Sequence, residues 1–378
     1  MRALIVLPQP PSCEGGAAAR CAVALLRGLR THGVDAVALA AHHAFSGNDP
    51  VPEDLRVEVV PIERTAPRIW RSPLARAWRP LGDLASPAFA ARIDAVAREV
   101  DVVHFDQIES ACYGPCRNVP SAVHLHYRVR DNPVRGPRQR GELAHRLELA
   151  LAERRAIARF GWLIANSPLV AQTMRGASTP VTTAPLSIDV PSGMRASLDG
   201  PPRLGIIGTA SWPPTRAALR RLIDGIWPAV RRRVPRAELH VAGRGTRDLL
   251  KGVRAAGIVL AGEVPSASRF LAEMSALIYP APAGSGMKVK VLESIAIGLP
   301  VVTTPAGAEG IEPNDGVLVH ADDAGLVASA VAMLANAGER HARGERARAT
   351  FVQRYTPERA TAPLVALYRA MLSPRISS

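Results

Sequence analysis

Short apolar runs alternate with longer amphipathic segments along the first half of the chain, as strands alternate with helices in α/β proteins. The apolar runs predict strands at 2–7, 34–39, 55–60, 101–105, 121–126 and 162–165. The amphipathic segments predict helices at 17–32, from about 88 onward, and at 141–159. Strands that alternate with helices form parallel sheets joined by crossovers. The first half therefore predicts an α/β domain with a parallel sheet.

The stretch 191–202 is rich in Pro, Gly and Ser and reads as a linker, after which the same alternation begins again. The second half predicts strands at 203–208, 238–243, 257–262 and 276–280, and helices at 215–233, 287–297 and 355–372. Several of these strands end in glycine. In such sheets ligands bind at the carboxyl ends of the strands, so we expect ligand sites there, in the cleft between two successive α/β units.

Composition narrows the possible partners of the chain. Its 378 residues carry a formal charge of +14, but only 4% are aromatic, which argues against a single-strand nucleic-acid binder. We expect a phosphorylated small molecule or an anionic membrane face as the partner, and no specific nucleic acid. No run reaches the ~18 apolar residues of a spanning helix, and Pro8 interrupts the first apolar run too early for a signal peptide. We expect a cytoplasmic protein, in solution or peripheral at the inner membrane face.

Lysine is scarce and unevenly placed. Of 47 basic residues only Lys251, Lys288 and Lys290 are lysines, and two of them open a mostly apolar predicted helix directly after Gly284-Ser285-Gly286. A helix N-terminus behind glycines binds anions, because its free N–H groups and its dipole both face the ligand. A lysine there favours a phosphate or diphosphate, and Glu293 one turn later can accept hydrogen bonds from sugar hydroxyls. The alternative is an ordinary Lys290–Glu293 pair on a helix surface.

The segment 286–304, followed by 307–310, resembles the C-terminal signature of the family 4 retaining glycosyltransferases, in the bacterial branch. Weaker similarities to that family are spread along the chain at 11–16, 165–167, 185–189, 208–215, 242–245 and 262–264. The resemblance implies a GT-B fold, with two Rossmann-like domains facing across a cleft. It implies an acceptor-side domain at 1–192, a nucleotide-sugar domain at 203–354, and a C-terminal helix within 355–378 that packs back on the first domain.

The same resemblance implies an activity: transfer of a sugar from a UDP or GDP sugar to an acceptor hydroxyl, with retention. We expect no metal and no other cofactor. Lys290 would hold the diphosphate, Glu293 the ribose, and His126 would support the reacting centre. These three are the expected catalytic residues. Donor-binding positions carried over from the family are Gly15, Gly16, Gly208, Arg216, Arg244, Val264, Ser285, Gly286, Met287, Lys288, Lys290 and Glu293. The acceptor, which can be a glycan, a lipid-linked intermediate or a small molecule, stays open.

Two departures from the family pattern matter. The acid that relatives carry eight residues before Glu293 is Ser285 here, so the usual carboxylate contact to the donor sugar is missing or is supplied differently. Many relatives place an Arg and a Lys after the first glycine of the second domain, where this chain has only Arg216, so Arg216 or Arg244 is the candidate substitute for that pair. The first departure keeps a second hypothesis open, a catalytically silent protein that binds a nucleotide sugar or a partner enzyme.

His126 has alternatives of its own. It alternates with His124 along a predicted strand, so both rings point to one face, as a metal pair, a solvated strand end or an active-site wall. No Asp-x-Asp motif occurs, so a divalent metal on the donor phosphates is not expected. Positive charge from lysine and a helix dipole would then offset the negative charge of the leaving diphosphate. With no nucleophilic carboxylate expected, we predict front-face displacement, in which the leaving phosphate helps to deprotonate the acceptor.

Overall fold

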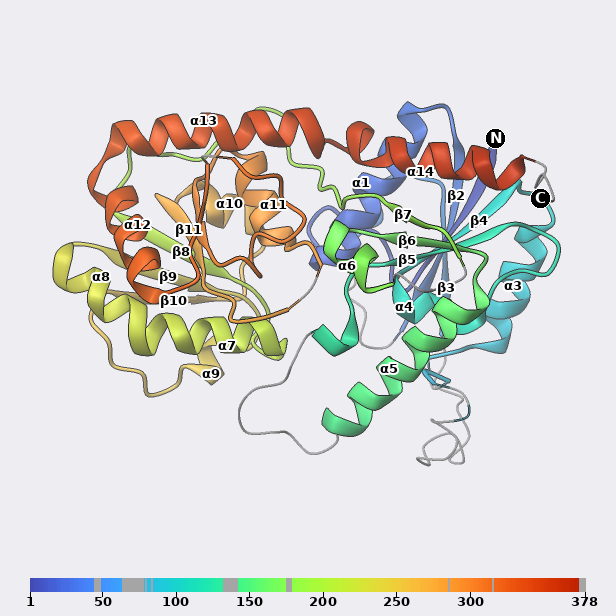
Figure 1. Ribbon diagram of the computed structural model, residues 1–378, viewed down its shortest axis with the longest axis horizontal. Helices are drawn as coiled ribbons and strands as arrows, with labels where there is room; N and C mark the ends of the chain where they lie inside the picture. The colour runs from blue at the N-terminus through green and yellow to red at the C-terminus, as the bar shows by residue number, and fades with distance from the viewer. Residues whose placement is uncertain are drawn as a thin grey trace. The chain divides into compact units, whose positions relative to one another are not determined.

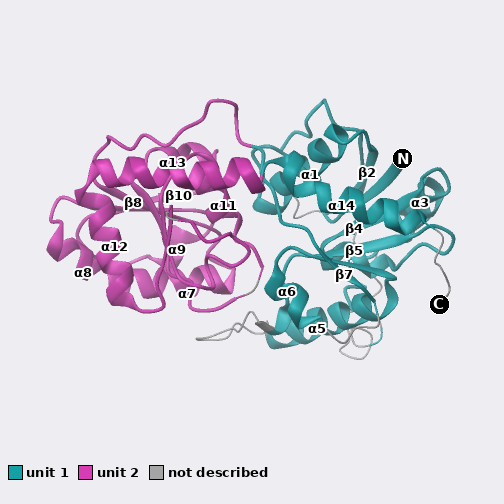
Figure 2. Ribbon diagram, turned by 45° about the horizontal axis from the view of Figure 1, so that its top comes forward, with its two compact units in different colours: residues 1–130, 137–189, 356–378 teal, residues 131–136, 190–355 magenta. Residues whose placement is uncertain are grey.

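The computed structural model describes residues 1–43, 49–62, 78, 80–82, 84–131, 142–174, 179–284, 286–314 and 316–373. The chain forms two compact units, shown in different colours in Figure 2. Unit 1 comprises Met1–Arg130, Pro137–Asp189 and Thr356–Ser378, and unit 2 comprises mainly Val190–Tyr355. The C-terminal helix therefore belongs to the first unit, and the chain leaves that unit and returns to it. The predicted linker 191–202 contains no helix or strand.

Unit 1 is built on a seven-stranded sheet in which all pairings are parallel, in the order β3-β2-β1-β4-β5-β6-β7. Its strands are β1 (Arg2–Leu7), β2 (Asp35–His42), β3 (Val57–Pro61), β4 (Val102–Asp106), β5 (Ser121–Leu125), β6 (Trp162–Ala165) and β7 (Val181–Thr183). The predicted strands of the first half are thus confirmed. The three-residue edge strand β7 has no apolar run long enough to be recognised.

Helices cover both faces of this sheet (Figure 1). They are α1 (Ala17–Thr31), α3 (Pro87–Ala97), α4 (Gln107–Ser110), α5 (Glu142–Arg159), α6 (Pro168–Thr173) and α14 (Pro357–Leu372). Alternate residues of β1 enter two separate cores, because successive side chains of a strand point to opposite faces. Leu4 and Val6 pack with α3, α5 and α6, whereas Ile5 and Leu7 pack with α1 and α14. Burial on both faces explains why the strands read as continuous apolar runs.

Unit 2 repeats the plan with six parallel strands in the order β10-β9-β8-β11-β12-β13. The strands are β8 (Arg203–Ile207), β9 (Glu238–Ala242), β10 (Ile258–Gly262), β11 (Ala276–Tyr279), β12 (Val301–Thr303) and β13 (Val317–Val319). The helices are α7 (Pro213–Arg221), α8 (Trp227–Arg233), α9 (Thr246–Leu249), α10 (Ala267–Ala272), α11 (Val289–Ala296), α12 (Asp323–Ala335) and α13 (Ala337–Arg354). The described residues contain no helix both long and apolar enough to span a bilayer.

Two predicted helices of unit 2 differ in detail. The helix expected at 215–233 is divided by a π-helical turn, Leu222–Ile226, into α7 and α8. The helix expected from Met287 begins at Val289, since Lys288 has extended backbone angles (φ −98°, ψ 104°) and caps the helix without a side-chain hydrogen bond. Lys290 is therefore the second residue of α11. The expected first turn at Met287 was wrong by two residues, but the lysine still lies in the first turn.

Candidate functional site

The strand order of unit 2 reverses between β8 and β11. From β8 the chain proceeds to β9 and β10 on one side, and from β11 it proceeds to β12 and β13 on the other. Such a reversal leaves a crevice at the carboxyl ends of the two central strands, where open α/β sheets bind their ligands. Gly208 follows β8, Thr215 lies in the first turn of α7, and Tyr279 ends β11. Lys290 from α11 contacts all three.

The Lys290 ammonium contacts a hydroxyl and an aromatic ring, and it occupies space that a glycine leaves open. Nζ donates to Thr215 Oγ1 over 3.2 Å and lies 4.1 Å from the centroid of the Tyr279 ring. A Cβ on Gly208 would lie 2.8 Å from Nζ, so the glycine that ends β8 leaves room for the ammonium. No carboxylate among the described residues lies within ion-pair distance of Nζ. Burial, reinforced by the charge of Lys288, lowers the pKa of Lys290 to about 7.

The loops that follow β8, β9 and β10 are tied together by backbone hydrogen bonds. Gly208 N donates to Ala242 O over 3.1 Å, and Gly243 N donates to Gly262 O over 2.6 Å. A Cβ on Gly243 would lie 2.2 Å from Gly208 O, so only glycine permits this approach. Ala210 N also donates to Arg244 O over 2.9 Å. The glycines at the ends of these strands thus allow the three loops to pack directly against one another through their backbones.

The segment before α11 is braced from two directions. Gly286, at φ +79°, donates its N–H to Glu309 Oε1 over 2.8 Å. The Lys288 ammonium donates to Gly286 O over 2.5 Å. Burial lowers the pKa of Lys288 to about 8, although the charge of Glu309 opposes this shift. Met287 between them is 6% exposed. Two lysines with lowered pKa values therefore face one region, which an anion would stabilise.

Glu293 lies one turn beyond Lys290 and is completely buried. Its Oε1 accepts a hydrogen bond of 2.6 Å from Ser268 Oγ, in α10. The two charged residues of α11 thus take partners from different elements, Thr215 for the lysine and Ser268 for the glutamate. The alternative from the sequence was an ordinary pair between Lys290 and Glu293 on the helix surface. The hydrogen bonds to Thr215 and Ser268 do not fit that alternative.

The other expected donor-binding residues of unit 2 are less closely connected with Lys290. Arg244 donates from Nε and Nη2 to Glu263 Oε1, and this ion pair is exposed. Arg216 Nη2 donates to Ser211 O over 3.4 Å. Val264, after β10, is half-buried. Ser285 lies outside the described residues, so the structure says nothing of its place.

In unit 1 the predicted glycine loop lies before α1. Gly16 is the N-cap of that helix, is exposed, and has no side-chain cap. Ser12 Oγ accepts hydrogen bonds from the N–H groups of Glu14 and Gly15, which shapes the loop. A Cβ on Gly15 would lie 3.1–3.3 Å from three neighbouring atoms, whereas one on Gly16 would meet no atom of the described residues within 4 Å. The two glycines thus differ, since Gly15 fits a tight turn and Gly16 leaves the helix terminus open.

His126 directly follows β5 and is held at both ends. Its Nε2 forms a hydrogen bond of 2.9 Å with Asp106 Oδ1, and its backbone oxygen accepts a bond of 2.6 Å from Asn166 Nδ2. The His126 side chain is 11% exposed and that of Asp106 only 3%. This burial excludes the solvated strand end among the alternatives from the sequence.

His126 belongs to a larger cluster on the face of the sheet that α1 and α14 cover. In β4, His104 and Asp106 alternate with residues that enter the opposite core, and Asp106 pairs in register with His124 of β5. Asp106 Oδ1 lies 3.7 Å from His124 Nδ1 and 3.9 Å from His104 Nε2. Ligand atoms of His104, Asp106 and His124 all lie within 4.8 Å of one another, so these residues could hold a metal ion. His104 Nδ1 is hydrogen-bonded to the Tyr368 hydroxyl of α14 over 2.7 Å.

The charges in this cluster are set by burial and by the imidazoles. Burial alone would raise the pKa of Asp106, but His126, His104 and His124 outweigh it and hold that pKa well below its usual range. Burial, followed by the charge of His126, holds the pKa of His124 well below its usual value. Asp106 is thus an anion and His124 a neutral ring at neutral pH.

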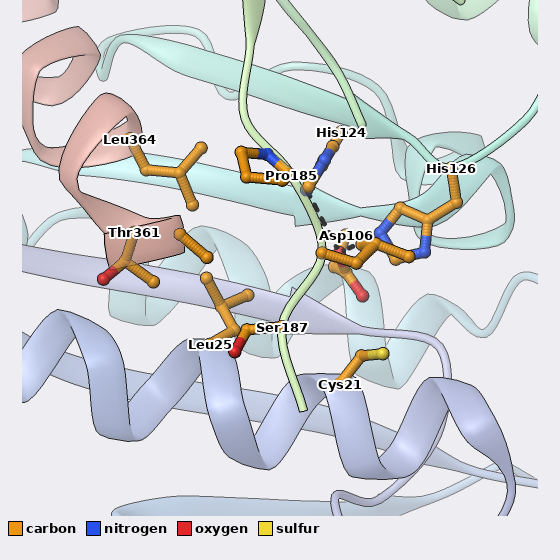
Figure 3. A pocket seen from close by; sticks show the side chains of 11 residues that line it. Cys21, Leu25, Asp106, His124, His126, Pro185, Ser187, Thr361 and Leu364 are labelled. Atoms are coloured by element: carbon orange, nitrogen blue, oxygen red, sulfur yellow. Dashed lines mark hydrogen bonds and ion pairs between the residues drawn. The ribbon is translucent and has the colours of Figure 1, made fainter. Parts of the chain in front are cut away.

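A small cavity of about 20 Å³ adjoins the cluster (Figure 3). Asp106, His124 and His126 line it on the sheet side, and Cys21 of α1 and Thr361 of α14 line it on the helix side. Its volume is close to what one water molecule needs, roughly 10–15 Å³. The sequence singled out His126 and His124 but missed His104 and Asp106. Both could have been found in the sequence, because His104-Phe105-Asp106 lies at the end of one predicted strand and His124-Leu125-His126 at the end of the next.

The two parallel-sheet units define the class of the fold: the chain has the GT-B fold of glycosyltransferases. Residues 201–337, which lie in unit 2, match the family described as Glycosyl transferases group 1. No curated protein matches the chain.

Solved structures match nearly the whole chain at low sequence identity. TarM of S. aureus, as a G117R mutant in complex with fondaparinux, alpha-GlcNAc-glycerol and UDP, is 10% identical with a TM-score of 0.67, over 97% of this chain and 99% of that one. HepE of Anabaena, in complex with UDP and glucose, is 15% identical with a TM-score of 0.65, over 97% and 99%. The lipopolysaccharide outer core galactosyltransferase WaaB is 12% identical with a TM-score of 0.58, over 98% and 100%. At such identities the similarity establishes the fold.

Proposed function

We propose that the protein is a glycosyltransferase that moves a sugar from a UDP or GDP sugar to an acceptor hydroxyl, with retention of configuration. The observation that carries the proposal is the environment of Lys290. Its ammonium lies at the strand-order reversal of unit 2, beside Gly208 and in the first turn of α11, and its pKa is lowered by burial. A cation placed so has no counter-charge among the residues that the structure describes, and a diphosphate supplies one.

The remaining residues take roles that fit this ligand. Lys288 and the N–H groups at the start of α11 add positive charge for the leaving diphosphate, so the proposed reaction uses no metal. Glu293 would accept hydrogen bonds from the ribose, which requires that it exchange its Ser268 contact for the ligand. We place His126 at the reacting centre, with Gly15 and Gly16 near the donor phosphate. Arg216, Arg244 and Val264 would contribute outer contacts to the nucleotide.

The relatives support this choice of donor. The family matched by residues 201–337 consists of glycosyl transferases, and structures of TarM and HepE contain UDP, with UDP-glucose in one of HepE. We propose the same donor class here and leave the acceptor as a hydroxyl of a glycan, a lipid-linked sugar or a small molecule. The proposed place of action is the cytoplasm or the inner membrane face.

The test is binding of UDP, GDP and their sugars by calorimetry to the parent protein and to Lys290→Met and Glu293→Gln. We expect each variant to lose affinity by about 10- to 100-fold, the effect of one charge-assisted hydrogen bond of roughly 1.5–3 kcal/mol. Lys251→Met is the matched control, because Lys251 is the third lysine and is exposed. The site assignment fails if all three variants bind like the parent.

A silent nucleotide-sugar-binding protein is the second candidate, and the serine at position 285 favours it. Donor hydrolysis separates the two functions, because retaining enzymes can release UDP or GDP by transfer of the sugar to water. Release that depends on Lys290 supports catalysis. Tight binding without release, under any acceptor tried, supports the silent protein.

A further inference from the structure

We propose that Asp106 is the positioning residue of His126: its carboxylate accepts the proton of His126 Nε2 and leaves Nδ1 as the ring nitrogen available to a ligand. The effect on sugar transfer rests on the function proposed above. The hydrogen bond itself does not, so it can be tested separately.

The assignment of the proton follows from the geometry of the contact and from the ordinary chemistry of a carboxylate, which is ionised near neutral pH. An ionised carboxylate has only acceptor sites. The 2.9 Å contact between His126 Nε2 and Asp106 Oδ1 is therefore a bond in which Nε2–H donates. A neutral His126 ring then has its lone pair on Nδ1, and only that atom can accept a proton or a hydrogen bond from a substrate.

The two neighbouring imidazoles do not compete for this bond. His124 Nδ1 and His104 Nε2 lie 3.7 Å and 3.9 Å from Asp106 Oδ1, beyond the range of a good hydrogen bond. His104 is also engaged at Nδ1 by the Tyr368 hydroxyl. Of the three imidazoles around Asp106, only His126 therefore lies at hydrogen-bond distance from its carboxylate.

The backbone of Asp106 is fixed in a way that aims the carboxylate. Gln107, the next residue, has φ +67°, a backbone conformation that is uncommon and strained for a residue other than glycine. Ser110 Oγ donates to Asp106 O over 2.6 Å, and Gln107 Nε2 donates to Asp106 Oδ2 over 3.2 Å. Together with Asn166 at the His126 backbone, these contacts restrain both ends of the dyad. Strain of this kind concentrates at functional sites.

The first measurement is the His126 Nε2–H proton signal in the full-length protein with 15N-labelled histidine. We expect a downfield signal that exchanges slowly with water in the parent. It disappears in His126→Gln, which assigns it, and in Asp106→Leu, which removes the acceptor. Tyr368→Phe is the matched control: it changes a buried member of the cluster but leaves the signal in place. A signal that survives Asp106→Leu overturns the proposal.

The second measurement is steady-state transfer or donor hydrolysis by Asp106→Asn, which keeps the size of the side chain and removes its charge. We expect kcat to fall by about 10- to 100-fold, by analogy with the loss of partners that orient metal-bound histidines, while the KM for the donor changes little. A purely structural role would instead lower the melting temperature and leave kcat unchanged, which overturns the proposal.

Two further outcomes are decisive. A stoichiometric metal retained by the purified protein would occupy Asp106 Oδ1 and contradict the proposal. If the parent protein neither transfers nor hydrolyses any sugar, the proposed function fails, but the proton signal still decides the role of Asp106.

Discussion

We expect Lys290 to couple binding of the proposed donor to proton uptake. Its pKa of about 7, lowered first by burial, means that much of this lysine is neutral at pH 8 in the free protein. A bound diphosphate favours the ammonium, so binding draws a proton from solution. We expect uptake of up to about one proton per UDP at pH 8, with a smaller part from Lys288. Calorimetry in buffers of different ionisation enthalpy measures this number.

The lowered pKa of Lys290 also determines how the stability of the folded protein changes with pH. The folded pKa of Lys290 lies below the unfolded value of 10.5, so the unfolded chain binds more protons between about pH 7 and 10.5. This lysine therefore makes the free protein more stable as the pH rises through that window. Lys290→Met should flatten the rise and reduce the proton uptake on UDP binding. Unchanged uptake in this variant would mean that Lys290 is not at the phosphate.

Gly208 allows a second test at the scale of one residue. Gly208→Ala places a Cβ 2.8 Å from Lys290 Nζ and 3.0 Å from Thr215 Cγ2, so the ammonium must move. We expect UDP affinity to fall about tenfold or more, since a charge-assisted hydrogen bond is worth roughly 1.5–3 kcal/mol. Gly252→Ala is the control: its φ of +88° is also positive, but nothing lies within 4 Å of the added Cβ. Equal affinities in both variants would contradict the close approach.

At the residue scale, sequence reasoning found the groups that local motifs carry. Lys290 and Gly208 were predicted because a helix start behind glycines and a strand that ends in glycine are both local signals. Asp106 was missed because its importance depends on the register of β4 against β5, which brings it beside His124. Ser268, the partner of Glu293, is 25 residues away along the chain and was equally hidden.

At the scale of elements, the close packing of α1 against α14 depends on a glycine, Gly28. A Cβ on Gly28 would lie 2.2 Å from Pro357 O and 2.7 Å from Thr361 Oγ1. Gly28→Ala must therefore push the first turn of α14 away, which we expect to destabilise unit 1 by about 1–3 kcal/mol, as overpacking does. Hydrogen exchange resolved by segment should show faster exchange in α14.

A glycine without such a contact provides the control for this helix crossing. Gly338, in the first turn of α13, has only Asn336 Oδ1 within 4 Å of an added Cβ, at 3.5 Å. Gly338→Ala should leave stability unchanged or raise it slightly, since alanine favours helices. If both variants behave alike, the close contact of α1 with α14 is not what holds the C-terminal helix.

Elements were predicted where burial imposes a pattern on the sequence. Parallel strands covered on both faces need continuous apolar runs, and those runs located β1, β4, β6 and β11. The π-helical turn Leu222–Ile226 lies inside a helical pattern and leaves no trace in it. The start of α11 at Val289 depends on the backbone angles of Lys288, which composition does not dictate.

At the scale of the whole molecule, two rounds of strand–helix alternation separated by a Pro/Gly/Ser-rich stretch were enough to predict two α/β units. The return of the C-terminal helix to unit 1 came from the family resemblance and not from the pattern, because nothing local tells a final helix which core it joins. In the structure its Leu364 and Tyr368 complete the core formed by α1 and β1. Which core a helix joins through such long-range packing can be seen only in the folded structure.

The net charge of the whole chain leads to a last prediction, which separates specific from general anion binding. A formal charge of +14 attracts any polyanion. Binding of a random DNA duplex should weaken steeply with salt, by about 10³–10⁵ between 50 and 200 mM if 6–10 phosphates are contacted. UDP carries few charges, and at the site proposed for it the partner Lys290 is partly buried, where salt screens less. We expect its affinity to fall by less than about tenfold over the same range, by calorimetry, while mobility shifts of the duplex vanish. Tight duplex binding that persists at 200 mM salt would instead point to nucleic acid as a specific partner.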